Sequence, residues 1–429
     1  MSYENIYNDI ISFESLYKAM RKIKNGVMWK DSTARYVADG LKETYRLRQE
    51  LLAGTYQIRP YLKFTVTDPK RREVMATQLR DRQYQRALCD GGLYGDLTEH
   101  FIRDNYACQV DRGMDDAIER LTEQLRRFYR HNGAEGWALK CDIKSYFAST
   151  PHDIAKRAVR KRVQDPQVCR AVEQIIDSFP GDRGIGLGSQ VSQLIELCVL
   201  DDMDHFIRER LHISVYARYM DDFVLVHPEK EYLAWCREQI RKRLDASDLT
   251  LNKKTSLFPL KQGITFLQRR FIVTETGKVI VKISKTSITR EKRKLRHMRG
   301  LVAAGRLPLE TPCNSFISWA AGVERKRARK NNKKRRLGKV AIKGPNAQAV
   351  ENMREYFRTL YGIDPYQGPR RAQNEQSADH RGALPGGGDA GQDHQPGSGP
   401  PPGGGGAGRS PGGADRGIGT GLYTHPWRG

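Results

Sequence analysis

The hydrophobic and polar positions along the chain follow two periods, which predicts both helices and strands. Apolar residues recur at helical spacing within five stretches: 1–55, 115–130, 154–179, 187–211 and 229–244. Strand-like alternation or short apolar runs occur in five others: 56–66, 137–143, 213–219, 264–271 and 278–283. A further apolar run at 223–226 follows 213–219 closely enough to pair with it as a hairpin. The pattern as a whole predicts an α+β fold.

The composition changes near residue 363. Residues 363–429 are rich in Gly and Pro and contain uninterrupted runs of both. Such a segment cannot bury enough apolar surface to offset the entropy lost on ordering, so we expect a disordered C-terminal tail. The folded part is then expected to span residues 1–362, which is long enough for two or three domains.

The formal net charge of the chain is +24, and the tail contributes none of it, because residues 363–429 hold six Arg and six Asp or Glu. An excess of this size on the folded part predicts a polyanionic partner. Nucleic acid is the favoured candidate. A membrane surface is a weaker one, since no basic amphipathic anchor is evident. A charged surface that merely aids solubility is the remaining alternative.

The seven cysteines have no C-x-x-C spacing, so their pattern suggests neither a zinc site nor a redox motif. Their odd number and wide gaps are typical of reduced thiols. The N-terminal residues lack the features of a signal peptide, and no apolar run approaches the ~18–20 residues that span a bilayer. We therefore expect a cytoplasmic protein that has no membrane partner.

Residues 282–339 form the most basic stretch, with nineteen Lys and Arg against three acids. Blocks such as Arg325, Lys326 and Arg327 place like charges where they repel one another on an ordinary helix. A disordered basic arm is one interpretation. Apolar residues around Trp319 nevertheless recur at helical spacing, which favours helices that contact a nucleic-acid backbone.

Two adjacent carboxylates, Asp221 and Asp222, lie between the apolar runs of the predicted hairpin. Acids at a tight turn are often only turn formers. Here the flanking runs are strongly apolar, so the acids are expected at the end of a buried element. Neighbouring carboxylates repel each other, and a hard divalent cation with oxygen ligands supplies the counter-charge.

A third acid, Asp142, ends the predicted strand at 137–143 and is followed by aromatic residues. It could be a helix cap or a turn residue. The functional alternative is a two-metal centre, in which metals about 3.5–4 Å apart stabilise the attacking and leaving oxygens of phosphoryl transfer. Such a centre would lower the pKa of a primer 3′-hydroxyl and neutralise charge that develops on the α-phosphate.

These motifs and their order resemble those of bacterial retroelement reverse transcriptases across residues 56–275. The resemblance implies an RNA-directed DNA polymerase with the right-hand fold. Its implied parts are N-terminal helices with fingers (1–135), an interleaved palm (136–275), a basic helical thumb (276–362) and the tail (363–429). It also implies two Mg²⁺ ions, with Mn²⁺ as an alternative, together with an RNA template, a DNA or RNA primer and deoxynucleotides. A small basic accessory protein is a further expected partner.

The resemblance assigns roles to individual residues. Asp142, Asp221 and Asp222 match the three catalytic aspartates, and Ile143 joins them in the implied metal site. Phe147 matches the aromatic gate that excludes a 2′-hydroxyl. The residues implied to bind the nucleotide, besides Phe147, are Lys70, Arg72, Leu187, Gly188 and Gln193. Lys254 matches the lysine that is proposed to protonate the pyrophosphate leaving group.

The residues implied to contact nucleic acid are Arg82, Arg112, Arg269, Arg270, Arg325, Lys326 and Arg327. Arg82 is either structural or template-facing, and Gln109 departs from the family by replacing a basic residue. Gln268 likewise replaces a usual glycine in the segment that resembles the primer grip.

The type of retroelement depends on one segment. Leu187 and Gly188, followed by Ser192 and Gln193, resemble the reverse transcriptases of diversity-generating retroelements, which copy adenines unfaithfully. Retroviral and group II intron enzymes usually have Gln where Leu187 stands. A group II intron type or a defence-associated enzyme is the alternative within the class. An RNA-binding maturase scaffold, for which catalysis is incidental, is the alternative outside it.

Overall fold

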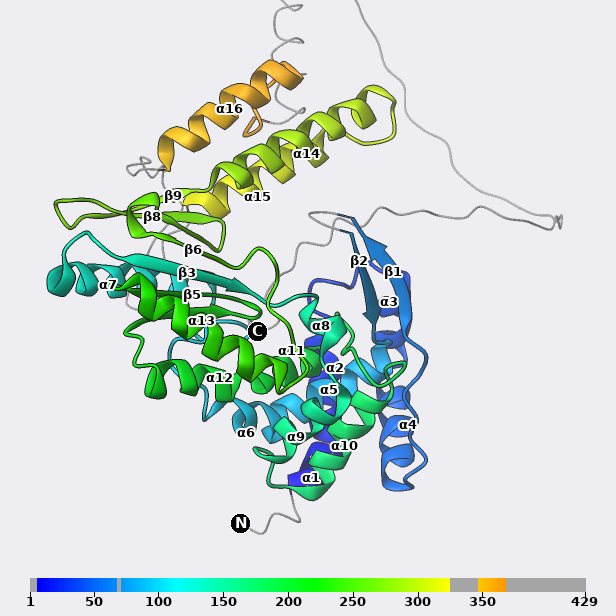
Figure 1. Ribbon diagram of the computed structural model, residues 1–429. Helices are drawn as coiled ribbons and strands as arrows, with labels where there is room; N and C mark the ends of the chain where they lie inside the picture. Colours follow the sequence, from blue (N-terminus) through cyan, green and yellow to red (C-terminus); the bar gives the residue numbers. More distant parts are fainter. Residues whose placement is uncertain (1–5, 68–70, 325–345, 368–429) are drawn as a thin grey trace, which may run out of the picture.

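The computed structural model describes residues 6–67, 71–324 and 346–367. Figure 1 shows a central sheet with its helices, a β-hairpin to one side, and long helices above a smaller second sheet. The elements are α+β as predicted, and the sheets are antiparallel. None of the helices in the described residues combines the length and apolar character that crossing a bilayer requires.

The central sheet has the strand order β4-β5-β3-β6. Its strands are β3 (Trp137–Asp142), β4 (Val215–Tyr219), β5 (Asp222–His227) and β6 (Ser256–Pro259). Side chains of β5 alternate between two cores, because Phe223 belongs to one cluster and Val224 to the other. Helix α13 (Lys230–Asp245) contributes to the first cluster and α7 (Met114–Asn132) to the second. Burial on both faces explains why β5 reads as a continuous apolar run.

The N-terminal helices lie together at one side of the central sheet. They are α1 (Ile6–Ile10), α2 (Phe13–Ile23), α3 (Asp31–Ala38), α4 (Gly40–Leu52), α5 (Leu79–Leu88) and α6 (Tyr94–Thr98), with a π-helical turn at Cys89–Leu93. The hairpin of β1 (Leu62–Val66) and β2 (Arg72–Ala76) extends from them. The strand predicted from residue 56 begins instead at Leu62. Asp81 accepts bonds from the Tyr56 hydroxyl and the Arg59 main chain, which fixes this approach away from β2.

The helix predicted at 187–211 is divided. Its parts are α11 (Gln190–Val199), α12 (Asp201–His205) and a π-helical turn, Phe206–Arg210. Ser189 caps α11 through a bond from the Ser192 main chain, so Leu187 and Gly188 precede the helix. Preceding it are α8 (Tyr146–Ser149), α9 (His152–Arg160) and α10 (Pro166–Asp177).

The strand predicted at 264–271 is instead a hairpin. It comprises β7 (Ile264–Phe266) and β8 (Arg269–Val273), and β9 (Val279–Ile283) completes a three-stranded sheet. Leu267 and Gln268 both take positive φ, +49° and +60°, as a two-residue type I′ turn requires. The usual Asn-Gly signal of that turn is absent, which is why the sequence pattern missed it.

Three helices follow: α14 (Lys285–Ala303), α15 (Glu310–Glu324) and α16 (Ala347–Tyr361). They share a core that includes Leu295, Phe316 and Phe357. The basic helical region predicted at 276–362 thus has its own hydrophobic cluster. The block with Arg325, Lys326 and Arg327, and the predicted disordered tail beyond Gln367, lie outside the described residues.

Candidate active site

Asp142, Asp221 and Asp222 meet at one end of the central sheet. The β3–β5 register places Asp142 directly opposite Asp222. Tyr219 pairs with Asp222 across β4 and β5, so Met220 and Asp221 form a two-residue turn. Met220 takes φ +58°, a region that favours glycine, so the turn carries backbone strain. Local register therefore gathers acids that are about 80 residues apart in sequence.

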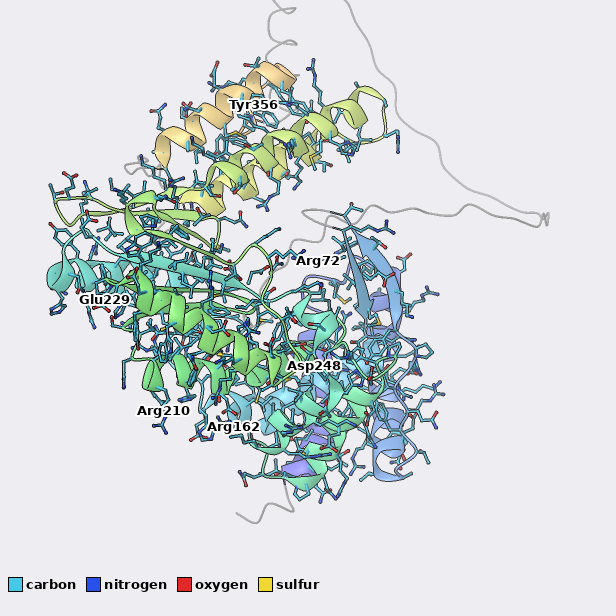
Figure 2. The ribbon with its side chains drawn as sticks, in the orientation of Figure 1. Arg72, Arg162, Arg210, Glu229, Asp248 and Tyr356 are labelled. Carbon is cyan, nitrogen blue, oxygen red and sulfur yellow. The ribbon has the colours of Figure 1, made fainter. Side chains whose placement is uncertain are left out.

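Asp221 and Asp222 resist ionisation. Burial raises the pKa of Asp222 to about 6, and the charges of Asp221 and Asp142 act in the same direction. Lys140 opposes them, with its Nζ 3.4 Å from Asp222 Oδ2. Burial also raises the pKa of Asp221, and the charge of Arg72 counteracts it. Arg72 is the first residue of β2, and Figure 2 labels it beside the β1–β2 hairpin. A cation of this hairpin therefore acts on Asp221 at the end of the sheet.

The residues present fit a hard divalent cation. The Oδ1 atom of Asp222 is buried and has no hydrogen-bond partner within the described chain. Ile143 can offer only its main-chain carbonyl. Asn252 donates to the Asp142 carbonyl at 2.7 Å, and the carbonyls of successive strand residues point to opposite sides. The Ile143 carbonyl is thus directed away from Asn252, toward the β5 side that carries Asp222.

These oxygens do not form a closed cage. Across the described ranges, no three His, Cys, Asp or Glu side chains are gathered closely enough to be a preformed metal site. Carboxylate and carbonyl oxygens are nevertheless the ligands that Mg²⁺ takes, usually with waters and substrate phosphates completing its shell. The arrangement suits a cation shared with a substrate better than one held by protein alone.

A buried ion pair that the sequence analysis did not identify holds the Met220–Asp221 turn. Arg218 is 1% exposed, and its Nε donates to Asp204 Oδ1 at 2.7 Å while a second nitrogen bonds Oδ2. The same guanidinium donates to the Met220 carbonyl at 3.1 Å and the Leu197 carbonyl at 3.2 Å. Burial alone would lower the pKa of Arg218, but Asp204 more than offsets this and keeps it charged. The sequence signal that could have revealed this ion pair is the presence of an arginine within the apolar strand β4.

The residues predicted to bind the nucleotide lie on three neighbouring segments. Phe147 is on α8, where its carbonyl accepts a bond from Ile185 at 2.7 Å. Leu187 accepts a bond from the Met75 main chain, which ties this segment to β2. Gly188 takes φ +119°, and a Cβ there would lie 3.1 Å from the Met75 carbonyl oxygen, so glycine permits the close approach. Gln193 accepts a bond from Cys108. Lys70 lies outside the described residues.

Several arginines predicted to contact nucleic acid are engaged within the protein. Arg269 is 7% exposed and donates to the Gly322 carbonyl of α15, a position that favours a structural role over contact with nucleic acid. Arg112 donates to the carbonyls of Ile102 and Asn105, which fixes the segment that pairs with β4. Arg82 donates to the Thr77 carbonyl, which favours the structural alternative stated for it.

Two predicted basic residues remain on the surface. Arg270 is exposed although it donates to the Gln262 carbonyl. Lys254 is exposed on the turn that follows Asn252, whose main chain donates to Asp142. This turn brings Lys254 near the end of the sheet that carries Asp142, while its side chain remains accessible.

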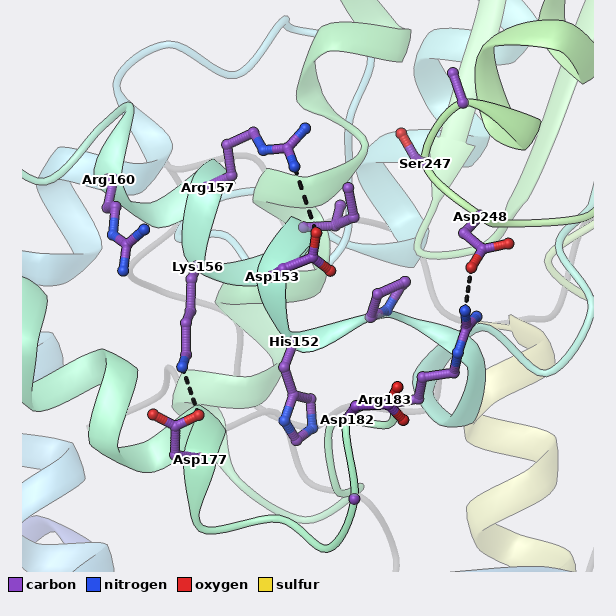
Figure 3. Close-up of a pocket in the computed structure, with 14 residues that line it drawn as sticks. His152, Asp153, Lys156, Arg157, Arg160, Asp177, Asp182, Arg183, Ser247 and Asp248 are labelled. Carbon is purple, nitrogen blue, oxygen red and sulfur yellow. Dashed lines mark hydrogen bonds and ion pairs between the residues drawn. The ribbon is translucent and has the colours of Figure 1, made fainter.

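A cavity of about 830 Å³ lies elsewhere. It is lined by α9, the loop around Asp182 and the turn at Asp248. Figure 3 shows ion pairs among its charged residues, such as Lys156 with Asp177 and Arg183 with Asp248. No predicted site residue lines this cavity, so it is separate from the acids at the end of the sheet.

Residues 72–270 match the family model of reverse transcriptase (RNA-dependent DNA polymerase). The chain carries a reverse transcriptase domain. The matched segment begins at Arg72, includes all three aspartates and ends within the β7–β9 sheet. The reverse transcriptase domain has a right-hand polymerase fold, and its enzyme class is RNA-directed DNA polymerase, a nucleotidyltransferase.

The proteins that are similar to this chain include a bacterial protein and a telomerase. Protein YkfC of Escherichia coli (strain K12) is 27% identical, over 53% of this chain and 70% of its own length. Telomerase from Candida albicans, in a complex with the TWJ fragment of telomeric RNA, is 16% identical with a TM-score of 0.43. That match covers 62% of this chain, which spans about half, 54%, of the telomerase chain.

The buried ion pair yields a stability prediction. Arg218→Met should lower the free energy of unfolding by about 3–5 kcal/mol, because Asp204 is left buried without its cation. Urea denaturation followed by circular dichroism measures the change. Arg241→Met is the matched control, since Arg241 pairs with Glu238 and Asp245 on the surface and should contribute less than about 1 kcal/mol. Equal effects of the two variants would contradict the role given to Arg218.

The raised pKa of Asp222 gives a second prediction. The folded pKa of about 6 exceeds the ordinary 3.8, so the wild type loses stability as pH rises from about 4 to 6. Asn cannot ionise. Asp222→Asn should therefore be more stable than the wild type by about 1–3 kcal/mol at pH 7 in EDTA, and the difference should vanish near pH 4. Thermal denaturation across this pH range tests it, and a destabilised variant at pH 7 would contradict it.

Proposed function

We propose that this chain synthesises DNA on an RNA template by two-metal nucleotidyl transfer at Asp142, Asp221 and Asp222. The observation that carries the proposal is the register of the sheet, which sets Asp142 opposite Asp222. The Oδ1 atom of Asp222 is buried and has no hydrogen-bond partner within the described chain. Mg²⁺, or Mn²⁺ in its place, would be held by the three carboxylates and the Ile143 carbonyl. When bound, it would activate a primer 3′-hydroxyl and neutralise charge on the phosphates.

The surrounding residues supply binding and orientation. Arg72, which is exposed and acts electrostatically on Asp221, is placed to pair with the triphosphate of an incoming nucleotide. Phe147 stands on α8 just past Asp142, where an aromatic ring would exclude a 2′-hydroxyl by contact. Lys254 is an accessible ammonium that would give a proton to the departing pyrophosphate.

The helical region after β9 is proposed to hold the template–primer duplex. The exposed basic side chains on or beside α14 are Lys282, Lys285, Arg293, Arg296 and Arg299. Arg296 is oriented by its bond to the Tyr356 hydroxyl of α16. Cations held on a rigid helix pair with successive phosphates without reading sequence. The RNA template, the DNA or RNA primer and deoxynucleotides are the proposed partners, and a small basic accessory protein is a further one.

Substitution of Asp221 tests the polymerase proposal. Asp221→Asn should reduce nucleotide incorporation on a primed RNA template about 10³-fold or more, since it removes several kcal/mol of transition-state stabilisation. Binding of the same RNA, measured by fluorescence anisotropy, should be unchanged. Asp202→Asn, which alters an exposed acid paired with Lys161, is the control. If the biological activity persists in Asp221→Asn, the chain works as an RNA-binding scaffold instead.

We further propose the diversity-generating type, on the basis of the Leu187–Gly188 and Ser192–Gln193 pattern. The Leu187 main chain is fixed by Met75 and its side chain is partly exposed, so its identity can change while the backbone keeps its place. Leu187 is thereby a residue through which contact with the nucleotide or template base can be tuned.

The type is tested by template-dependent errors. The wild type should misincorporate preferentially opposite template adenines, and Leu187→Gln should reduce this excess several-fold while errors at other bases stay the same. Sequencing of the cDNA gives both rates at once. Equal error rates at all four template bases in the wild type would favour a group II intron or defence-associated enzyme.

A further inference from the structure

Glu196 is a carboxylic acid in an apolar setting that the proposed chemistry does not use. It lies on α11 and is 0% exposed. Its Oε1 atom is buried without a hydrogen-bond partner in the described chain, and Oε2 lies 2.9 Å from the Thr150 hydroxyl oxygen. Within the described residues no ion pair includes Glu196. The Arg218 guanidinium instead binds Asp204 and the carbonyls of Met220 and Leu197. An ionised carboxylate would have almost nothing to compensate its charge.

Counting protons decides which group donates. The Thr150 hydroxyl has a single proton, and the Tyr146 carbonyl oxygen lies 3.0 Å away to accept it. The Tyr146 hydroxyl likewise donates its only proton to the Glu196 main-chain carbonyl at 2.5 Å. Both neighbouring hydroxyls therefore have carbonyl acceptors. The carboxyl of Glu196 satisfies the arrangement best as a neutral acid that donates to the Thr150 oxygen.

The bond between Glu196 and Thr150 has a structural consequence, since Thr150 ends the short helix that carries Phe147. Gly184 donates to the Thr150 carbonyl at 2.9 Å, and Ile185 donates to the Phe147 carbonyl at 2.7 Å. These two bonds attach one side of α8 to the segment before α11. Glu196 attaches the other side to α11 itself, through Thr150 and Tyr146. A four-residue helix cannot hold its own position, so these ties set where Phe147 stands.

We propose that Glu196 is a positioning residue which, as a neutral hydrogen-bond donor to Thr150, fixes α8 and thereby the aromatic gate Phe147. The inference rests on the proposed function in one respect, namely that Phe147 selects the sugar of the incoming nucleotide. Ionisation of Glu196 would turn the Thr150 proton toward the carboxylate. The Tyr146 carbonyl would keep the Thr150 main-chain N–H, at 3.1 Å, but lose the Thr150 hydroxyl, so α8 would loosen.

The charged and titratable groups around Glu196 agree with this state. From α8 it meets the Tyr146 hydroxyl, from the β4–β5 turn the charge of Asp221, and from β4 the charge of Arg218 acts on Tyr146. Helix α9 contributes apolar side chains to the core that it shares with α11. Burial raises the pKa of Glu196 to about 8, and the charge of Asp221 acts in the same direction. The hydroxyls of Thr150 and Tyr146 lower the pKa, but burial outweighs them.

The first measurement is sugar selectivity against pH, taken as the ratio of deoxynucleotide to ribonucleotide incorporation efficiency. This ratio cancels the ionisation of the primer hydroxyl, which both substrates share. In the wild type it should fall about tenfold per pH unit above about 8, toward the value of Phe147→Ala. Glu196→Gln keeps a neutral hydrogen-bond donor at every pH, so its selectivity ratio should not change with pH. If Glu196→Gln follows the wild-type curve, the proposal is wrong.

The second measurement needs no catalysis. A folded pKa above the ordinary 4.5 means that wild-type stability is complete below about pH 4.5 and declines as pH rises toward 8. The melting temperature of Glu196→Gln minus that of the wild type should therefore grow between pH 5 and pH 8. The exposed Glu99→Gln should show no such trend. A constant difference for Glu196→Gln would mean that the buried group is ionised, which would overturn the proposal.

The two measurements separate the two proposals. If the full-length protein incorporates no nucleotide, the proposed function fails, while the melting series still reports the protonation of Glu196. If incorporation proceeds and selectivity ignores Glu196, only the positioning role fails. Thr150→Val, which removes the acceptor, should lower selectivity at pH 7 toward that of Phe147→Ala, and unchanged selectivity would contradict the role of this bond.

Discussion

The end of the sheet that carries Asp221 and Asp222 depends on the buried pair of Arg218 and Asp204. The strand β4 has to deliver a strained turn at Met220, and a strained turn persists only where its surroundings overdetermine it. Arg218 does so by binding Asp204, the Met220 carbonyl and the end of α11 with one planar group. A cation thus holds the turn in place while the carboxylates of that turn repel each other.

The same region stores unfavourable charge. Asp221 and Asp222 are buried enough that each resists ionisation, and Lys140 and Arg72 only partly relieve them. Ionisable groups perturbed in this way cluster at functional sites. A cation brought in with the nucleotide would relieve the unfavourable charge at the moment when chemistry is needed. The apolar core on both sheet faces therefore does more than stabilise, because it supplies the low dielectric in which these charges interact strongly.

The sequence predicted the elements well wherever one period of apolar residues dominated, as in β3, β5 and α13. It failed where tertiary contacts decided. The helix predicted at 187–211 divides near Leu200, and the strand predicted at 264–271 folds back through Leu267 and Gln268 without the usual turn residues. The three aspartates could be proposed because they lie in motifs. The partners of Arg218 and Glu196 could not, since a buried polar pair leaves only one odd residue in each apolar run.

The turn at Leu267 and Gln268 is also the point to which α14 is attached. Ser284, at the start of α14, donates to the Gln268 carbonyl, and Ser287 and Arg290 bond the Gln268 side chain. Helix α14 has 19 residues, so it extends about 28 Å from this turn. A rotation of about 7° at the turn would move the far end by about 3.4 Å, the rise of one base pair. If α14 holds a template–primer duplex, as proposed, a small rotation at the turn would therefore displace the far end of the helix by one nucleotide step.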